Sequence, residues 1–244
     1  FPIAPEDMQG LKDLLTRVRG GGIHGLNVTI PHKQNVIPLL DELTPTAQAI
    51  GAVNTISMRE GKLVGDNTDA PGFLKDLGGL IGSRHDRKAA RQTSEVSKVL
   101  IPGAGGSARA VVYALIHDDW DVTLAARRPE QAQQLAATYH LPITKLPIPD
   151  SQPPTFDLLV NTTPLGMTPN VNASPWPDHL PFPKDAAVYD LVYNPRETKL
   201  VRDARAQGLP ARTGLGMLIE QAALAFEIWT GYRPPREVLF EAVQ

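Results

Sequence analysis

Apolar and polar positions near the start of the chain follow two different periods. Apolar residues between 6 and 19 recur three or four positions apart, which predicts a helix, and the glycines at 20–22 end it. Short β-branched runs then predict strands at 26–30, 52–58 and 62–64. A further helix is expected after Pro71. The first part of the chain therefore mixes helices with strands.

From residue 99 onward, apolar strands and helices follow one another in regular order. The predicted strands are 99–101, 122–126, 158–160 and 188–191. Helices are predicted at 107–116, 129–139 and 216–229, with one more helix after the last of these. This alternation is typical of a parallel sheet with helices on both faces, so the chain is predicted to be an α/β protein.

Residues 83–98 interrupt this order. Five basic residues stand there among Ser, Thr, Gln and Ala, with only Asp86 and Glu95 of opposite charge. A nucleic-acid surface would require interleaved aromatic residues, which the segment lacks. We therefore expect an exposed connector and a domain boundary.

Composition excludes several classes of protein. The 244 residues are 42% hydrophobic and 20% charged, unlike disordered, collagen-like or coiled-coil chains. A formal net charge of −2 gives no reason to expect a nucleic-acid or membrane surface, and no apolar run approaches the roughly 20 residues of a membrane span. The absence of Cys excludes disulfides and thiolate metal sites and fits a reducing compartment, and no histidine spacing indicates a metal site.

A glycine-rich loop follows one predicted strand and opens a predicted helix. Residues 103–108 have the GxGxxA spacing of dinucleotide-binding units. Gly103 permits the tight turn, Gly105 leaves room for a pyrophosphate, and Ala108 lets the helix pack on the strand. A plain strand-to-helix turn would have the same spacing. The candidate phosphate-binding residues are Gly103, Ala104, Gly105, Gly106 and Ser107.

Two arginines stand where such a unit selects its cofactor. An NAD-binding unit places Asp or Glu about 20 residues after the glycines, at the end of the second strand. This chain has Arg127 and Arg128 there, and guanidinium groups bind a ribose 2′-phosphate. NADP is therefore favoured over NAD, and the alternative is that both arginines are merely exposed.

Three polar segments upstream contain candidate catalytic residues, at 27–33, 52–55 and 65–69. A nicotinamide-dependent reaction at a carbonyl needs a group that exchanges a proton with the oxygen. Lys33 and Asp69 form a plausible pair, in which the carboxylate orients the ammonium. Taken singly, Lys33 would more often lie on the surface and Asp69 would cap a helix.

Together these motifs resemble the shikimate dehydrogenase family. The resemblance runs in family order through seven segments: NVTIPHK (27–33), AVNT (52–55), DNTD (66–69), GAGGSARA (103–110), NTTPLGM (161–167), YDLVYNP (189–195) and GLGMLIEQAA (214–223). It implies reversible, NADP-dependent reduction of 3-dehydroshikimate to shikimate, in the pathway to chorismate and the aromatic amino acids.

The resemblance also implies roles for individual residues. Lys33 and Asp69 match the catalytic pair, with Lys33 passing the proton and Asp69 positioning it and binding a substrate hydroxyl. The residues that match substrate-binding positions are Thr29, Lys33, Asn54, Asp69, Tyr193 and Gln221. Those that match positions around the nicotinamide and its ribose are Thr163, Leu191, Gly214 and Met217, of which Leu191 and Met217 would also suit core packing.

The family pattern implies two lobes with the active site in the cleft between them. Residues 1–82 and 214–244 would form an open α/β substrate-binding lobe, and 97–213 a doubly wound Rossmann lobe for NADP. We expect a cytoplasmic enzyme, monomeric or homodimeric, whose partners are small molecules and include no nucleic acid, membrane or metal.

Two departures from the family pattern leave alternatives open. Gln131 stands where many members have a second arginine, although Arg128 adds one beside Arg127. The family's opening strand and its Ser-x-Ser loop do not occur before Phe1, so we expect the substrate-binding lobe to lack its N-terminal part. The alternatives are a quinate/shikimate dehydrogenase that uses NAD, a non-catalytic sensor, and a fragment that only binds NADP.

Overall fold

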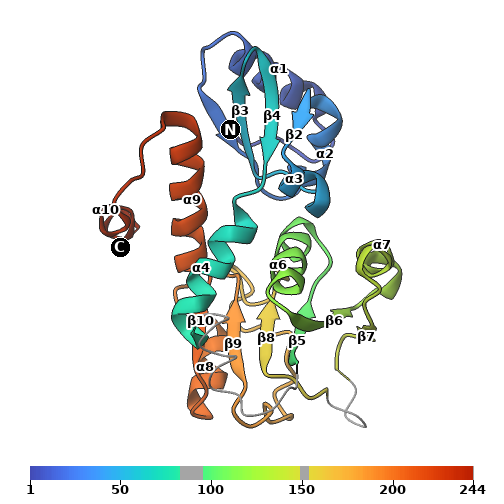
Figure 1. Ribbon diagram of the computed structural model, residues 1–244. Coiled ribbons are helices and arrows are strands. Elements are labelled where there is room, and N and C mark those ends of the chain that lie inside the picture. The colour runs from blue at the N-terminus through green and yellow to red at the C-terminus, as the bar shows by residue number, and fades with distance from the viewer. Residues whose placement is uncertain (83–95, 149–153, 244) are drawn as a thin grey trace. The chain divides into compact units, whose positions relative to one another are not determined.

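The computed structural model describes residues 1–82, 96–148 and 154–243 (Figure 1). The chain divides into two compact units, residues 1–72 with 219–244, and residues 73–218. Both divisions fall inside helices, in α4 (Asp69–Ile81) and α9 (Leu215–Thr230). Most of the expected connector lies outside the described residues, and the domain limits expected near 82 and 214 stay predictions.

The first unit contains a four-stranded sheet in the order β1-β3-β4-β2. Its strands are β1 (Gly25–Asn27), β2 (Glu42–Leu43), β3 (Thr55–Arg59) and β4 (Lys62–Asp66). β3 and β4 form an antiparallel hairpin, β1 pairs antiparallel with β3, and β2 pairs parallel with β4. The hairpin turn uses positive φ at Glu60 and Gly61.

The helices of this unit include α1 and α3, which contact the sheet. They are α1 (Met8–Arg19), α2 (His32–Asn35), η1 (Ile37–Leu39), α3 (Pro45–Ile50), the first turn of α4, most of α9, and α10 (Arg236–Glu241). The predicted first helix begins at Met8 because the Asp7 side chain accepts a hydrogen bond from Gly10 N at 2.8 Å. Its apolar stripe, Leu11, Leu15 and Val18, is buried in one core with Ile56 and Leu63 of the hairpin.

Two predicted strands in this unit are too long. β1 ends at Asn27 because the chain turns at Thr29, whose carbonyl accepts from His32 N, and Ile30 is exposed. β3 begins only at Thr55, since Val53 N donates to the carbonyl of Lys33 rather than to a neighbouring strand. Both corrections fall on the polar segments that contain the candidate site.

The second unit is built on a six-stranded, all-parallel sheet in the order β10-β9-β8-β5-β6-β7. The strands are β5 (Ser97–Pro102), β6 (Trp120–Ala126), β7 (Ile143–Lys145), β8 (Leu158–Asn161), β9 (Ala187–Asp190) and β10 (Ala211–Thr213). The chain starts in the middle, runs outward through β6 and β7, and returns to β8 on the other side of β5. This is the doubly wound dinucleotide-binding topology, with its switch point between β5 and β8.

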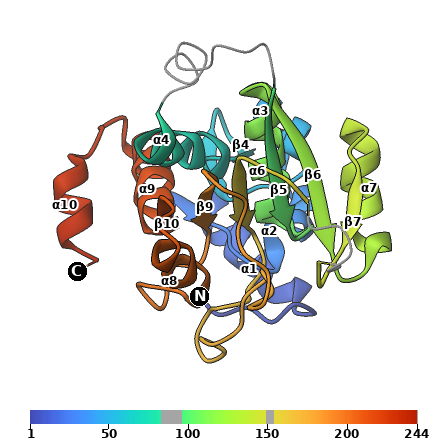
Figure 2. The same cartoon turned by 90° about the horizontal axis from the view of Figure 1, so that it is seen from below.

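Three helices of this unit connect its strands. They are α6 (Gly106–His117), α7 (Pro129–Tyr139) and α8 (Lys199–Ala206). Figure 2 shows α7 beside β6 and β7, and α8 beside β9 and β10 at the other end of the sheet. The sequence predicted α6 and α7 but missed α8 and the two three-residue edge strands β7 and β10.

A polar cluster fixes the second part of α4 to β9 and β10 inside this unit. Tyr189 Oη donates to Asp76 Oδ2 at 2.6 Å, and Arg212 Nη1 donates to Asp76 Oδ1 at 2.8 Å. Burial and the adjacent carboxylate raise the pKa of Tyr189 well above its ordinary value of 10, so the phenol stays a donor. The arrangement stabilises the helix on the sheet edge.

The described part of the chain holds no helix that is both long and apolar enough to cross a membrane. Within that same part, no group of three His, Asp or Glu side chains could hold a metal ion.

Candidate active site

A buried ion pair lies in the first unit. Lys33 Nζ, on α2, lies 2.6 Å from Asp69 Oδ2, on the first residue of α4. The residues are only 9% and 4% exposed. The Lys33 backbone is fixed as well, because its carbonyl accepts from Val53 N at 2.7 Å. The pair predicted from the sequence is therefore brought together, away from bulk solvent, where its charges interact strongly.

Asn67 determines where α4 begins and so where Asp69 points. Its Oδ1 accepts from the backbone N of Asp69 at 3.1 Å and of Ala70 at 3.2 Å. Its Nδ2 donates to the carbonyl of Ala52 at 2.9 Å. Because Asn67 satisfies the first amides of the helix, the Asp69 carboxylate is not used as a cap and is available for the lysine.

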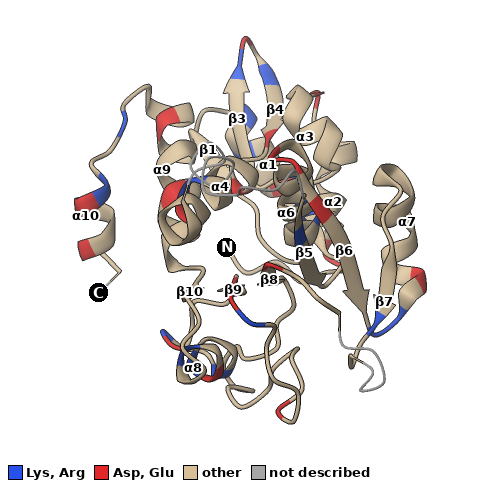
Figure 3. Cartoon of the chain, turned by 60° about the horizontal axis from the view of Figure 1, so that its bottom comes forward, with Lys and Arg blue, Asp and Glu red and all other residues tan. Residues whose placement is uncertain are grey.

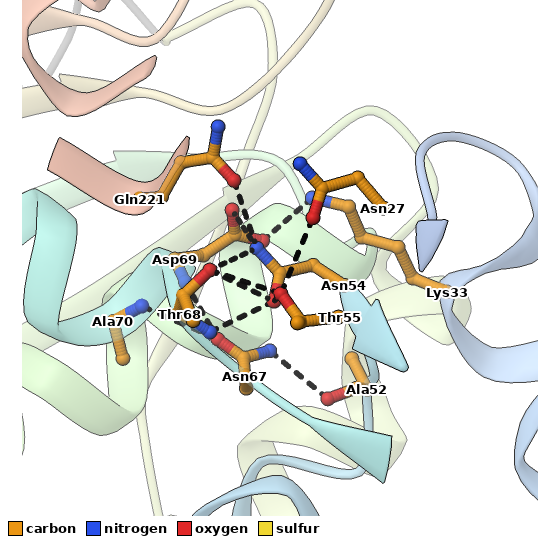
Figure 4. A network of polar contacts seen from close by, with 10 residues as sticks. All are labelled: Asn27, Lys33, Ala52, Asn54, Thr55, Asn67, Thr68, Asp69, Ala70 and Gln221. Carbon is orange, nitrogen blue, oxygen red and sulfur yellow. Dashed lines mark hydrogen bonds and ion pairs between the residues drawn. The ribbon is translucent and has the colours of Figure 1, made fainter. Parts of the chain in front are cut away.

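Asn54 lies at the centre of the polar network drawn in Figure 4. Its Nδ2 lies within 2.9 Å of both Thr68 Oγ1 and Asp69 Oδ1, and 3.2 Å from Gln221 Oε1. Its Oδ1 accepts from Thr68 N at 2.8 Å. An amide carries two N–H donors, so three acceptors share them. A ligand hydroxyl that donates to one of these acceptors would relieve that competition.

Gln221 reaches this network from α9, 167 positions from Asn54. The approach depends on Gly72 of α4, where an added Cβ would lie 2.8 Å from Gln221 N. A glycine in a helix costs about 0.5–1 kcal/mol relative to alanine, so close contact between the two helices explains its presence. Gln221 is 9% exposed, and its side chain completes a set of neutral donors and acceptors beside the ion pair.

The structure does not bring two other predicted substrate residues, Thr29 and Tyr193, into this hydrogen-bond network. Thr29 is exposed, and in the described part of the chain its side chain forms no hydrogen bond. Tyr193 belongs to the second unit, where it is 46% exposed. Sequence reasoning did not single out Asn27 or Thr55, although both lie in the quoted segments; Thr55 Oγ1 donates to Asn54 Oδ1 at 3.0 Å and lies 3.4 Å from Asn27 Oδ1.

The glycine loop lies at the switch point of the second unit's sheet. Gly103 has φ of +119°, and an added Cβ would lie 2.1 Å from Thr162 Oγ1, so only glycine fits. At Gly105, by contrast, nothing lies within 4 Å of an added Cβ. The loop therefore has open space over its centre, directly before the N-terminus of α6, where the helix dipole favours phosphate.

Arg127 and Arg128 lie between the end of β6 and the start of α7, and both are exposed. Figure 3 shows this segment in blue. Neither guanidinium bonds to another residue within the described ranges, so both are available to an anion. Gln131 is exposed on α7.

The residues predicted around the nicotinamide lie at the carboxyl ends of β8 to β10. Thr163 follows β8, and its N and Oγ1 both donate to Asn161 Oδ1, at 2.9 and 2.7 Å. An added Cβ on Gly214 would lie 2.3 Å from the carbonyl of Leu191, so these two residues are in close contact. Met217 is buried on α9.

Asn161 and Asp190 are polar residues that sequence reasoning did not single out. They end the neighbouring strands β8 and β9 and are fully buried. Burial raises the pKa of Asp190 to about 6, while hydrogen bonds from Thr198, Val192 and Asn161 act in the opposite direction. The only sequence signal was a polar residue at the end of each apolar run.

Two family models and several known proteins match this chain. The model of the shikimate dehydrogenase substrate binding domain matches residues 3–56, and that of the shikimate 5′-dehydrogenase C-terminal domain matches residues 214–244. A curated relative from Salinibacter ruber (strain DSM 13855 / M31), named shikimate dehydrogenase (NADP(+)), is 42% identical over 253 residues. The match covers 100% of this chain and 85% of the relative.

Two solved structures are also similar. Shikimate 5-dehydrogenase from Thermus thermophilus, in complex with NADP(H) and shikimate, is 39% identical with a TM-score of 0.80, over 96% of this chain and 83% of that one. Shikimate dehydrogenase from Aquifex aeolicus is 34% identical with a TM-score of 0.82, over 100% of this chain and 85% of that one.

Proposed function

The chain belongs to the shikimate dehydrogenase family, and from this premise we propose that it interconverts 3-dehydroshikimate and shikimate with NADP as cofactor. It is an oxidoreductase acting on a CH–OH group. The observation that carries the proposal is the buried pair of Lys33 and Asp69, with Asn54 and Gln221 in the same network. The reaction belongs to the pathway that leads to chorismate and the aromatic amino acids.

The residues of the second unit fit NADP. Gly103 permits the turn that a side chain would block, and the space at Gly105 admits a pyrophosphate. Arg127 and Arg128 are exposed cations at the end of β6, where a 2′-phosphate is read. Bound NADPH supplies the hydride for reduction, and NADP⁺ accepts it in oxidation. Thr163, Leu191, Gly214 and Met217 would line the nicotinamide end.

Lys33 is the residue that exchanges the proton. In reduction its Nζ donates a proton to the carbonyl oxygen of the substrate, and in oxidation it takes the proton from the hydroxyl. Asp69 holds Nζ through Oδ2, 2.6 Å away, and its Oδ1 is positioned to accept from a substrate hydroxyl. Because both groups are buried, their positions are fixed before the substrate binds.

The remaining polar residues suit a ring that carries several hydroxyls. Asn54 and Gln221 each offer a donor and an acceptor, and Thr29 and Tyr193 each offer a hydroxyl. A substrate analogue that lacked one hydroxyl would lose that hydroxyl's hydrogen bonds to these buried groups, which is a basis for discrimination between substrates. We further propose that the protein works in the cytoplasm, as a monomer or a homodimer.

A comparison of four reactions tests the proposed function. Initial rates are measured for shikimate and for quinate, each with NADP⁺ and with NAD⁺. The highest kcat/KM is expected for shikimate with NADP⁺. A higher value with NAD⁺ or with quinate would instead support a quinate/shikimate dehydrogenase, and binding of NADP⁺ without any turnover would support a sensor or a cofactor-binding fragment.

A further inference from the structure

The Asp190 carboxylate lies where two loops leave the sheet of the second unit. Asp190 is the last residue of β9 and pairs in register with Asn161, the last residue of β8. Both residues have no exposed surface. Across the described ranges, no Lys, Arg or His forms an ion pair with this carboxylate. Such a group is costly to bury, so its neighbours must satisfy it by hydrogen bonds.

Three neutral donors converge on it. Oδ1 accepts from Asn161 Nδ2 at 2.8 Å and from Val192 N at 3.0 Å, and Oδ2 accepts from Thr198 Oγ1 at 2.7 Å. A carboxylate has only acceptors, so one side chain can satisfy all three donors. An amide at the same place would direct a donor toward Thr198.

Each of these bonds fixes a different segment. Asn161 in turn accepts from Thr163 N and Oγ1 and donates to the carbonyl of Leu165 at 3.2 Å, which fixes the loop after β8. Val192 lies in the loop after β9, between Leu191 and Tyr193. Thr198 is the N-cap of α8, where that loop ends.

We infer that Asp190 is a positioning residue for the nicotinamide end of the cofactor, because its single buried carboxylate fixes the positions of two loops, the one that contains Thr163 and the one that contains Leu191. The inference rests on the proposed function, which places these two residues against the nicotinamide. Asp190 touches neither substrate nor cofactor; it acts through Asn161, Val192 and Thr198.

A purely structural role would affect the whole unit, so the test separates the two ends of the cofactor. The variants are D190A and D190N, with D157N as a matched control, since Asp157 accepts from Lys98 N near the opposite end of β8. Affinity is measured for NADP⁺ and for 2′,5′-ADP, which has the 2′-phosphate but no nicotinamide. Turnover of shikimate is measured in parallel, and circular dichroism checks folding.

We expect D190A to lower kcat by about 100-fold, since misplacing reacting groups by about 1 Å has an effect of that size. NADP⁺ affinity should fall, while 2′,5′-ADP affinity stays within about twofold of the wild type. D190N should lie between D190A and the wild type, because its Oδ1 still accepts from Asn161 and Val192. If D190A does not fold, the affinities and the turnover of D190N alone are compared with those of the wild type. D157N should leave all three measurements unchanged.

Two results would overturn the inference. One is an equal loss of affinity for NADP⁺ and 2′,5′-ADP, which would show a general structural role. The other is wild-type turnover and binding in the Asp190 variants. If the wild type itself does not oxidise shikimate, the proposed function fails, but the comparison of the two affinities still decides the role of Asp190.

Discussion

Lys33 and Asp69 depend on each other, because changing one of them removes the opposite charge from a buried group. Breaking a buried pair by changing one member usually costs about 3–5 kcal/mol. We therefore expect Asp69→Asn to lower the free energy of unfolding by about 3 kcal/mol at neutral pH. Urea unfolding of the variant and the wild type measures this directly.

The double variant K33M/D69N is the control. It removes both charges and keeps similar volumes, so its unfolding free energy should recover toward that of the wild type. If D69N unfolds at the wild-type urea concentration, the two side chains do not form the buried ion pair that the structure shows.

Arg127 and Arg128 should determine cofactor choice rather than stability, because both are exposed and unpaired within the described ranges. Hydrogen bonds to charged groups contribute about 1.5–3 kcal/mol each, so R127Q/R128Q should weaken NADP⁺ binding by about 100-fold. NAD⁺ binding should change little, since NAD⁺ lacks the 2′-phosphate. Isothermal titration with both cofactors measures the difference.

The exposed Arg202 on α8 provides a matched control, and R202Q should leave both affinities unchanged. Equal weakening of NADP⁺ and NAD⁺ in R127Q/R128Q would show that the two arginines do not bind the 2′-phosphate.

At this scale the sequence indicated Lys33, Asp69, Asn54 and Gln221, and the structure brings all four into one network. Their catalytic and binding roles stay predictions. Asn67 and Asp190 were not singled out, because a polar residue shows its use only through partners elsewhere in the chain. The motifs that contain Asn67 and Asp190 could be recognised in the sequence, but the hydrogen bonds that fix the two side chains could not.

Contacts between helices can be tested at Gly72 of α4. An added Cβ would lie 2.8 Å from the backbone N of Gln221, so Gly72→Ala should push α9 away and lower the free energy of unfolding by about 1–3 kcal/mol. The KM for shikimate should rise as well, because Gln221 moves with α9. Urea unfolding and steady-state kinetics provide the two measurements.

Gly78 of the same helix gives the matched control. Nothing lies within 4 Å of an added Cβ there, so Gly78→Ala should leave KM unchanged and stabilise the protein by about 0.5–1 kcal/mol. Similar effects of the two substitutions would contradict the close contact between α4 and α9.

The ends of β8 and β9 make stability depend on pH through Asp190. Its pKa of about 6 exceeds the ordinary 3.8, so its contribution to stability is complete below about pH 4 and is lost as pH rises through about 6. The difference in unfolding free energy between the wild type and D190N should therefore fall by about 3 kcal/mol from pH 4 to pH 7. Urea unfolding at several pH values measures it, and a constant difference would contradict the raised pKa.

Elements of ten or more residues could be predicted, since α1, α6, α7 and α9 each show several helical turns of apolar spacing. Four of the short elements could not. α2, β2, β7 and β10 have two to four residues, too few for any period to be visible. α3 had a local signal in Thr44-Pro45, because Thr44 caps the helix and Pro45 begins it.

For the whole molecule, the alternation of strands and helices was enough to predict an α/β fold with a doubly wound sheet. It was not enough to predict the strand order, because the return from β7 to β8 passes across β5 and leaves no local pattern. The order matters for function, since it creates the switch point at which the glycine loop and Thr163 lie near neighbouring strand ends.

Proton exchange is assigned to residues of the first unit, and cofactor binding to residues of the second. The most direct test is the formation of NADPH from shikimate and NADP⁺ by the wild type and by Lys33→Ala, with NADP⁺ affinity measured for both. This assignment of residues predicts that Lys33→Ala lowers kcat by about 10²–10⁴-fold and leaves NADP⁺ affinity within about twofold. Unchanged turnover in Lys33→Ala, or no turnover by the wild type, would contradict it.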